Sequence, residues 1–373
     1  MFVGKDMTSD MIFLTRASLP AYEEYIEEIR SIWDENWITS FGPKHSRLET
    51  KLKDYLHCSK LALFTNGHSA LEAALQAMNK GGVIITSPYT FASTTNAIIR
   101  TGYTPVFCDV ERDTYTIDPN KIEELITEKT CAILPIHVYG NVCDVEKISD
   151  IAKRHGLMVI YDAAHAFGVE YKGKNIASFG DASVFSFHAS KVFNTAEGGA
   201  VCYHDGDYGE RLTCIRNFGL QPGDGSFPGG NGKMSELSAA LGLCNLRHIK
   251  EYIDKRKKLT AVYYENLHVG SGISFIKRQE NVTQNYAYMP ICFDTQHARD
   301  RVFDHLHKHN VLCQKHFETP TNMFSYTVNR YKGNTPIADE LSKKTLLLPL
   351  FSDMSNDQVI YVCELINDLV KYD

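Results

Sequence analysis

Two residues with the chemistry of a carbonyl-binding site stand at the ends of apolar segments. Lys191 follows a run of alternating apolar and polar residues, 183–188, and precedes a Gly-Gly pair at 198–199. At the end of a buried strand, desolvation would lower the pKa of the lysine amine and make it a nucleophile toward carbonyl carbons. Asp162 directly follows the apolar run 157–161. A Schiff-base lysine and an aspartate that pairs with a pyridinium nitrogen are the groups that pyridoxal 5'-phosphate (PLP) requires, although Lys191 alone would more often be a solvated surface lysine.

The composition is that of an ordinary globular protein and argues against several classes. The 373 residues are 43% apolar and 23% charged, and a formal net charge of −6 gives no basic footprint for nucleic acid. No apolar run approaches the roughly 18 residues of a membrane span, and residues 1–10 lack the apolar core of a signal peptide. The ten cysteines form no CxxC pair, which predicts reduced thiols in a cytoplasmic protein. Since the histidines show no HExxH or clustered spacing, no metal site is predicted.

Short apolar runs alternate with segments of helical spacing between about residues 60 and 205. Strands that alternate with helices predict a mostly parallel sheet wrapped by helices. In such sheets ligands bind beyond the carboxyl ends of the strands, and Asp162 stands at such an end. The predicted strands lie in the runs 61–64, 83–86, 105–108, 131–136, 158–161, 182–187 and 200–203.

The segments on either side of this region complete a two-domain prediction. Two helices are expected within residues 21–57, a long loop at 219–232 and a helix at 236–267. The remainder mixes strands and helices, which predicts a smaller α+β domain. We place a large domain at 1–255 and a small domain at 256–373, although a helix bridges that boundary. The expected small-domain elements are strands at 286–292 and 346–349 and helices at 297–307 and 357–370.

Other motifs each allow a functional and a plain structural interpretation. The segment 65–69 opens a helix, whose free amides could bind phosphate, but Ser69 could simply be its N-cap. Phe91 could stack on a flat ring or pack in the core. Asp162 could instead cap a following helix, and His165 could be a core histidine. The Gly-rich segment 229–236 could carry function or be a loop that ends at a helix N-cap.

Taken together, these segments resemble the DegT/DnrJ/StrS family of PLP-dependent sugar aminotransferases over about residues 12–370. The motifs that carry the resemblance are the strand-end Asp162, the block Ser186-Phe-His-x-x-Lys191 followed by Glu197-Gly-Gly, the segment Pro135-Ile-His-Val-Tyr-Gly140, and the block Asn231-x-Lys-Met-x-Glu236. The resemblance implies an α/β fold of the aspartate-aminotransferase type (PLP fold type I). That fold has a large domain with a mixed, mostly parallel seven-stranded sheet and a small C-terminal α+β domain. It also implies a homodimer with active sites at the subunit interface.

The resemblance assigns a role to each matching position. Lys191 would hold PLP and then move protons, and Asp162 would pair with the pyridinium nitrogen. The other implied roles are phosphate binding by Gly67, the amide of His68 and Ser186, ring stacking by Phe91, contact with the phenolic oxygen by His165, contact with the neighbouring subunit's phosphate by Asn231, and substrate binding by His188 and Lys233.

Two positions depart from the common family pattern, and a third position supports catalytic turnover. Many members have glutamine where this chain has His165, and threonine where it has His68. Lys191 is present, whereas a dehydratase branch of the family has histidine there.

Three phrases, 32–39, 161–168 and 191–197, resemble the subgroup that aminates C4 of dTDP-4-dehydro-6-deoxyglucose with glutamate as donor. We therefore expect a cytoplasmic ping-pong transaminase that supplies O-antigen, the outer part of lipopolysaccharide, or another surface glycan. Two alternatives stay open: amination at C3 of a 3-ketosugar, and a PLP-binding regulatory protein without turnover.

Overall fold

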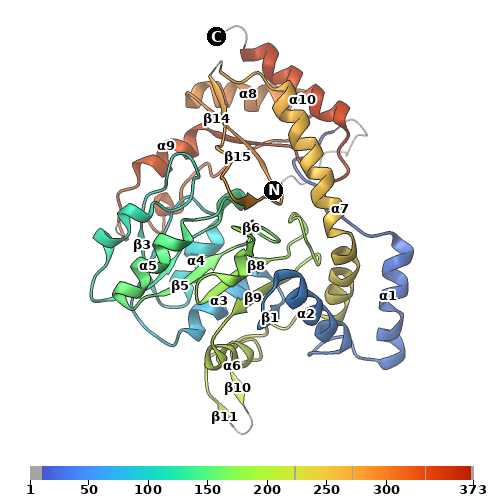
Figure 1. The fold of residues 1–373 in the computed structure, drawn as a ribbon, viewed down its shortest axis with the longest axis vertical. Helices are drawn as coiled ribbons and strands as arrows, with labels where there is room; N and C mark the ends of the chain where they lie inside the picture. The colour runs from blue at the N-terminus through green and yellow to red at the C-terminus, as the bar shows by residue number, and fades with distance from the viewer. Residues whose placement is uncertain (1–10, 222–223, 271, 332, 371–373) are drawn as a thin grey trace.

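The computed structural model describes residues 11–221, 224–270, 272–331 and 333–370, and its central element is a seven-stranded sheet (Figure 1). The strand order is β1-β9-β8-β5-β4-β2-β3, in which β9 runs antiparallel to both neighbours and all other neighbours are parallel. Each of the seven predicted apolar runs coincides with or overlaps one strand. The strands are β1 (Leu61–Phe64), β2 (Val83–Thr86), β3 (Thr104–Phe107), β4 (Thr130–Leu134), β5 (Met158–Asp162), β8 (Ala182–Ser186) and β9 (Gly199–Tyr203).

Helices cover both faces of this sheet, because successive side chains of a strand point to opposite sides. Leu61 and Leu63 of β1 join one core with α2, α5 and α7, whereas Ala62 and Phe64 join a second core with α3, α4 and α6. The helices are α2 (Pro43–Leu56), α3 (Gly67–Ala77), α4 (Ala92–Arg100), α5 (Val145–His155), α6 (Gly206–Ile215) and α7 (Glu236–Asn266).

A four-stranded antiparallel sheet, in the order β12-β14-β16-β15, forms the centre of the C-terminal part. Its strands pack with α8 and α10 around a separate apolar core, to which Ile12 from the N-terminal segment also belongs. The elements are β12 (Ile273–Phe275), β14 (Met289–Phe293), β15 (Gln314–Lys315), β16 (Thr345–Leu348), α8 (Gln296–Lys308), α9 (Pro336–Lys344) and α10 (Asn356–Val370).

The long helix α7 connects the two parts of the molecule (Figure 1). Leu243 and Ile249 in its first half belong to the core of the large sheet, and Leu259 and Tyr263 in its second half belong to the C-terminal core. The proposed domain boundary at 255/256 falls inside this helix and stays a prediction.

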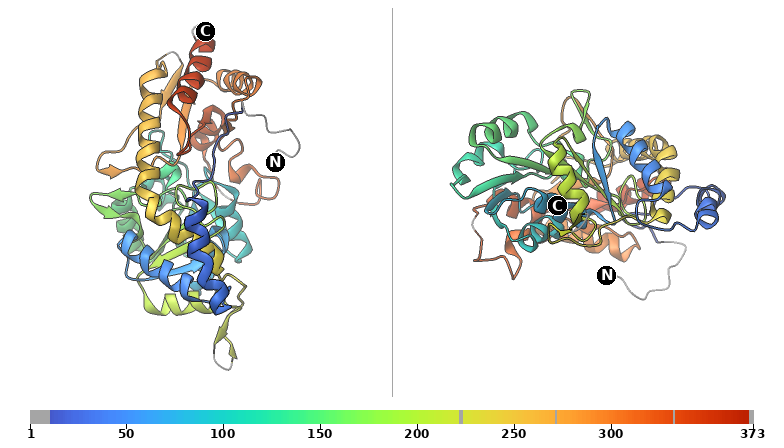
Figure 2. Two further views of the ribbon diagram at one scale, coloured as in Figure 1. Left: turned by 90° about the vertical axis from the view of Figure 1, so that its right-hand side faces the viewer. Right: turned by 90° about the horizontal axis from the view of Figure 1, so that it is seen from below.

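Three smaller features surround the main sheets. The segment predicted as one long loop, 219–232, contains the short hairpin of β10 (Leu220–Gln221) and β11 (Asp224–Gly225), which projects at the lower end of Figure 1. A small sheet joins β6 (Glu170–Tyr171), β7 (Lys174–Asn175) and β13 (Val282–Thr283). Helix α1 (Tyr22–Glu35) lies beside α7 at the edge of the molecule, as the two views of Figure 2 show.

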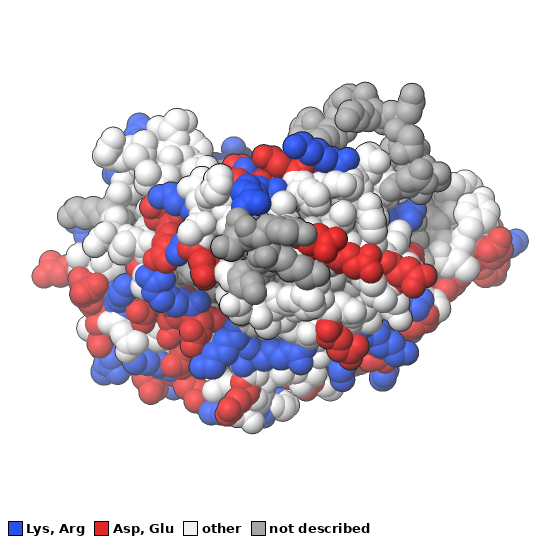
Figure 3. All heavy atoms as spheres, turned by 90° about the horizontal axis from the view of Figure 1, so that it is seen from above, with Lys and Arg blue, Asp and Glu red and all other residues white. Residues whose placement is uncertain are grey.

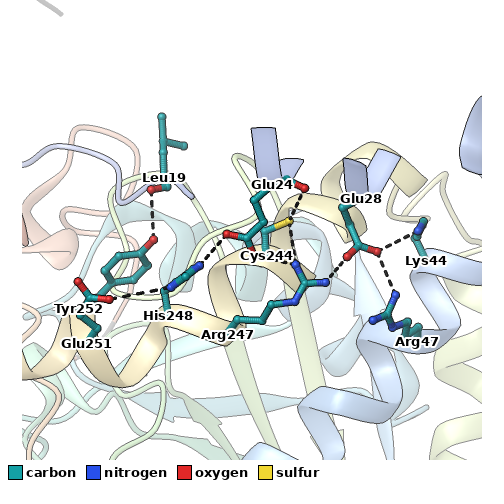
Figure 4. A network of polar contacts seen from close by, with 10 residues as sticks. All are labelled: Leu19, Glu24, Glu28, Lys44, Arg47, Cys244, Arg247, His248, Glu251 and Tyr252. Carbon is teal, nitrogen blue, oxygen red and sulfur yellow. Dashed lines mark hydrogen bonds and ion pairs between the residues drawn. The ribbon is translucent and has the colours of Figure 1, made fainter. Parts of the chain in front are cut away.

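A polar network attaches α1 to α2 and α7 (Figure 4). Glu28 on α1 is 8% exposed and accepts hydrogen bonds from Lys44 at 2.9 Å, from Arg47 at 3.1 Å and from Arg247. Glu24 accepts hydrogen bonds from Arg247, at 2.7 Å, and lies 2.7 Å from the His248 ring. Because three cations converge on one buried carboxylate, the charge of Glu28 is compensated where three helices meet.

The start of α2 is capped by a residue that is distant in the sequence. The fully buried carboxylate of Glu236, the first residue of α7, accepts hydrogen bonds from the backbone amides of Lys44, at 2.6 Å, and His45, at 3.0 Å. A Cβ atom at Gly42 would lie 2.6 Å from the Glu236 carboxyl carbon, so a larger residue there would displace the capping carboxylate. Glu236 belongs to a motif of the resemblance, and here it has a structural function, since carboxylates favour helix N-termini.

Charged side chains of both signs mix on the face over the C-terminal elements, without a continuous field of one sign among the described residues (Figure 3). None of the helices within the described ranges combines the length and the apolar character that crossing a membrane requires.

We expect Glu28→Gln to lose about 2 kcal/mol of unfolding free energy at pH 7, because it removes the charge that three cations share. Burial raises the pKa of Glu28, but hydrogen bonds from Lys44 and Arg247 outweigh it and leave this pKa lowered from 4.5. A carboxyl with a lowered folded pKa stabilises the protein above its unfolded pKa and loses that contribution as the pH falls through the folded pKa. The difference between wild type and variant should therefore shrink below pH 4.5.

Urea unfolding from pH 7 downward measures this difference. Glu27→Gln, an exposed neighbour on the same helix, is the matched control and should leave the unfolding midpoint unchanged. A loss of stability in Glu28→Gln that does not depend on pH would contradict the electrostatic explanation.

Candidate active site

A cavity of about 630 Å³ lies beyond the carboxyl ends of β1, β5 and β8 and is closed by residues of the C-terminal part. The cavity therefore forms between the two sheets, where open α/β folds bind ligands. It brings together eight of the residues expected from the sequence: Gly67, His68, Phe91, Asp162, His165, Ser186, His188 and Lys191. Within the described ranges no cluster of three or more His, Cys, Asp or Glu side chains could hold a metal ion.

Lys191 lies in the loop between β8 and β9, where it is half-buried. The loop is closed by backbone hydrogen bonds from Phe187 to Gly198, at 2.8 Å, and from Thr195 to Phe187, at 2.9 Å. Nζ of Lys191 donates a hydrogen bond to Oη of Tyr288 at 3.0 Å. Tyr288 precedes β14 and was not among the expected site residues, because no local spacing links it to a lysine 97 positions away.

Asp162 ends β5, and its side chain is buried at 7% exposure. Oδ2 accepts a hydrogen bond from Thr94 Oγ1 at 2.7 Å, and Oδ1 accepts one from the Ala164 amide at 3.1 Å. Burial raises the pKa of Asp162, and the two hydrogen bonds together with the Lys191 charge oppose that rise only in part. Residues 163–169 form turns, so Asp162 is not the N-cap of a helix. A cationic partner in the cavity would stabilise the ionised form of this buried carboxyl.

The first turn of α3 and Ser186 form a narrow cradle at one end of the cavity. The N-cap of α3 is Asn66, whose Oδ1 accepts a hydrogen bond from the Ser69 amide at 2.8 Å, so the alternative of Ser69 as N-cap is wrong. The amides of Gly67 and His68 have no acceptor within their own helix, as in any first turn. A Cβ atom at Gly67 would lie 2.7 Å from Cβ of Ser186. Small residues and free amides at a helix N-terminus suit an anion such as phosphate.

The remaining cavity residues have distinct surroundings. Nδ1 of His68 and Oγ of Ser93 lie 2.9 Å apart, so this ring has a protein partner of its own. Phe91 is 65% exposed at the cavity wall, which excludes the alternative of core packing. His188 is exposed and is held by Ser190, with Nδ1 2.9 Å from Oγ. Phe91 and His188 are therefore accessible from the cavity mouth.

His165 is buried against the aromatic wall of the cavity. Its Nδ1 accepts a hydrogen bond from the Tyr139 amide at 3.1 Å, and its ring centre lies 4.6 Å from that of Tyr288. Burial, together with the nearby charge of Lys191, lowers the pKa of His165 well below its usual value. The ring is therefore neutral.

Two expected residues lie outside this cavity. Asn231 is exposed and pairs with Asn217 in an isolated bridge. Nζ of Lys233 donates a hydrogen bond to Asn217 at 2.9 Å and lies 4.7 Å from the ring centre of Phe218. The expected contact of Asn231 with the neighbouring subunit's phosphate needs a second chain, and both this role and substrate binding by Lys233 stay predictions.

The cavity fits a pyridine ring that carries an aldehyde and a phosphate. The amine of Lys191 could reach the aldehyde, the buried carboxyl of Asp162 suits a ring nitrogen, and the cradle at Gly67 suits the phosphate. These three features come from separate loops of the large sheet and converge on one cavity.

A comparison with protein families and curated proteins agrees with this geometry. Residues 21–367 match the model of the DegT/DnrJ/EryC1/StrS aminotransferase family. The chain is 40% identical to a dTDP-4-amino-4,6-dideoxy-D-glucose transaminase of Escherichia coli, over 96% of this chain and 99% of the relative. It is 38% identical to a protein of the same name from Shigella dysenteriae, again over 96% and 99%. It is 34% identical to a GDP-perosamine synthase of Escherichia coli O157:H7, over 93% and 94%.

Solved structures show the same fold. DesI, determined in the presence of its TDP-sugar product, superposes with a TM-score of 0.93 at 29% identity over 98% of this chain and 95% of that one. PseC of Helicobacter pylori, an aminotransferase involved in the biosynthesis of pseudaminic acid, gives 0.90 at 25% identity over 97% and 100%. The expected aspartate-aminotransferase type of fold is therefore confirmed.

We expect Thr94→Val to raise the pKa of Asp162 further, because the Thr94 hydroxyl stabilises the ionised carboxylate. Carbon-13 NMR of the protein labelled at the aspartate carboxyl measures this titration, and Asp162→Asn identifies the signal. Thr95→Val is the matched control, because the buried Thr95 hydroxyl bonds to Thr321 instead. The same titration in Thr94→Val and wild type would contradict the electrostatic role of this hydroxyl.

Proposed function

Because the chain belongs to the DegT/DnrJ/EryC1/StrS aminotransferase family, we propose that it moves an amino group from glutamate to C4 of dTDP-4-dehydro-6-deoxyglucose. Family membership and the curated relatives establish the broader activity: the protein is a PLP-dependent nucleotide-sugar aminotransferase. The observation that carries the finer proposal is that two relatives near 40% identity over nearly their full length share one name, dTDP-4-amino-4,6-dideoxy-D-glucose transaminase. A relative with another nucleotide in its name is 34% identical.

Bound in the cavity, PLP supplies an electron sink that makes the carbon–hydrogen bond next to the nitrogen acidic. The half-buried amine of Lys191 would hold the cofactor through its aldehyde carbon and would move a proton to and from the substrate carbon that carries the nitrogen. Asp162 keeps the ring nitrogen protonated, since a buried carboxylate and a cation stabilise each other. The amides of Gly67 and His68 and the hydroxyl of Ser186 bind the phosphate.

Phe91 and His165 complete the cofactor contacts in this proposal. The exposed ring of Phe91 stacks on the pyridine, which accounts for an apolar side chain at the cavity wall. His165 is neutral and its Nδ1 already accepts a hydrogen bond, so its Nε2–H is left to donate to the phenolic oxygen. His165 would therefore offer an N–H donor at the position where many family members have glutamine, which also has an N–H donor.

We also propose that the protein is a cytoplasmic homodimer whose subunits share active sites, and that its product enters O-antigen or another surface glycan. All ten cysteines are free, which supports a reducing compartment. Exposed large apolar side chains support a buried subunit interface; they include Trp37, Ile38, Phe218 and Leu220. In the dimer, Asn231 binds the phosphate in the partner's site, and Lys233 binds the donor carboxylate.

The half-reactions test the substrate assignment. Purified enzyme is converted to its amino form with glutamate, the donor is removed, and dTDP-4-dehydro-6-deoxyglucose is added. We expect the visible absorbance of the bound cofactor to return together with a 4-amino sugar. Lys191→Ala should lose at least about a thousandfold in turnover, whereas the exposed Lys250→Ala should keep it.

Two results would overturn parts of this assignment. Full turnover in Lys191→Ala would remove the lysine from the mechanism. A clean glutamate half-reaction without return of absorbance would exclude this sugar, and amination of a 3-ketosugar would then identify the alternative carbon.

Complementation between two inactive chains tests the shared active site. Lys191→Ala and Asn231→Ala/Lys233→Ala chains are each expected to be inactive as homodimers. In a mixed dimer one site combines Lys191 from one chain with Asn231 and Lys233 from the other, so about half of the mixed-dimer sites should recover activity. Light scattering establishes the dimer, and two differently tagged chains allow the mixed dimer to be purified. A mixed dimer without activity would contradict the shared site.

A further inference from the structure

Tyr139 contacts two histidines of the cavity wall from behind. It lies in the short helix Val138–Gly140, is 5% exposed, and is not part of the cavity lining. Its backbone amide donates to His165, and its hydroxyl lies 3.0 Å from Nδ1 of His316. His316 follows β15 and lines the cavity opposite the large sheet. Tyr139 therefore contacts one histidine that follows a strand of the large sheet and one that follows a strand of the C-terminal sheet.

Four close contacts between the Tyr89 hydroxyl, the Tyr139 hydroxyl and His316 determine where the His316 proton lies. Tyr89 Oη is 2.6 Å from the carbonyl oxygen of His316, and because a carbonyl has no hydrogen, Tyr89 must donate. Tyr139 Oη is 2.9 Å from Tyr89 Oη, whose hydrogen is already used, so Tyr139 must donate to Tyr89. The 3.0 Å contact between Tyr139 Oη and His316 Nδ1 then needs a hydrogen from the histidine. Tyr139 Oη also lies 3.3 Å from the carbonyl oxygen of His316, the longest of the four contacts, which is left without a hydrogen of its own. At most three of the four contacts can each have a hydrogen, and this requires a proton on Nδ1 of His316.

The same counting gives the opposite result for His165. The Tyr139 amide can only donate, so Nδ1 of His165 is unprotonated. Burial lowers the pKa of His316 to about 3 and that of His165 well below its usual value, and the charge of Lys191 acts in the same direction on both. Both rings are therefore neutral, and each carries a single proton. No described residue shares a hydrogen bond with Nε2 of either ring.

We infer that Tyr139 is a positioning residue that holds His165 and His316 in opposite tautomers, so that the cavity wall offers an N–H donor from His165 and a bare nitrogen acceptor from His316. This inference rests on the proposed function where it names the ligand: Nε2 of His316 accepts a hydrogen bond from a hydroxyl of the hexose. Nδ1 of His316 faces Tyr139, behind the wall, so the opposite edge of the ring with Nε2 is the one toward the cavity.

A fixed acceptor has a consequence for substrate choice. Sugar hydroxyls both donate and accept, whereas the carbonyl that is to be aminated only accepts. A bare nitrogen at His316 therefore favours a hydroxyl-bearing carbon next to it and disfavours a ketone there. Because Tyr139 fixes the proton before the sugar arrives, no binding free energy is used to select the tautomer.

Neutron diffraction from crystals of the deuterated protein tests the tautomers directly and needs no substrate. We expect deuterium on Nδ1 of His316 and on Nε2 of His165. In Tyr139→Phe the backbone amide stays, so His165 should keep its tautomer while His316 loses the acceptor of its Nδ1 proton and takes up deuterium on Nε2. Deuterium on Nε2 of His316 in the wild type would overturn the inference.

Kinetics of the two half-reactions test the consequence for the sugar. For whichever nucleotide sugar is the substrate, Tyr139→Phe should raise KM about fivefold, which corresponds to the loss of about one hydrogen bond. The glutamate half-reaction should stay unchanged. Tyr115→Phe is the matched control, because this buried ring packs against Tyr89 and Tyr139 without contacting either histidine. An equal loss in both half-reactions, or no change in KM, would overturn the role of His316. Failure of dTDP-4-dehydro-6-deoxyglucose as a substrate would instead affect only the proposed function, since the neutron result does not involve a sugar.

Discussion

A carboxyl group buried at the end of β5 is the constraint on which the site depends. Burying Asp162 away from water costs free energy. Hydrogen bonds from the Thr94 hydroxyl and the Ala164 amide offset only part of this cost, so the pKa of Asp162 stays raised. The charge of Lys191, in the loop that follows the neighbouring strand β8, also compensates part of this cost. An incompletely compensated carboxyl stabilises whatever cation enters the cavity, and a protonated pyridine ring has the shape and charge for it.

The packing between the two sheets is as necessary as the residues of the large sheet. Tyr288 and His316 come from the C-terminal part, and they close the cavity against Lys191 and His165. Their position depends on α7, which contributes to both apolar cores, and α7 is in turn fixed to α1 and α2 by the carboxylates of Glu28 and Glu236. Charges far from the cavity therefore help to determine its shape, because a small rotation of α7 would move one wall against the other.

The sequence predicts those site residues whose type and position next to an apolar run are visible locally. Lys191, Asp162 and Gly67 follow apolar runs, and the carboxyl ends of parallel strands meet at one edge, so these residues converge as expected. Residues that act through distant contacts left no local signal. Thr94 belongs to a helical segment, and Tyr139 lies in a motif of the resemblance that assigned it no role; their partners lie 68 and 26 positions away. The alternative that Ser69 caps α3 was wrong, because serine and asparagine both cap helices and only the backbone decides that Asn66 is the N-cap.

The distribution of charge within the cavity also favours one direction for the proposed cofactor. The N-terminus of α3 presents free amides and the positive end of a helix dipole, whereas Asp162 presents a carboxyl at the end of another strand. A phosphate beside Asp162 would meet a second negative charge in a buried environment, which raises the free energy of that orientation steeply. In between, the neutral pair His165 and His316 adds hydrogen-bonding direction without net charge. In the proposed reaction, Lys191 would therefore move a proton beside uncharged histidine walls, and the carboxyl of Asp162 and the N-terminus of α3 would meet the two ends of the cofactor.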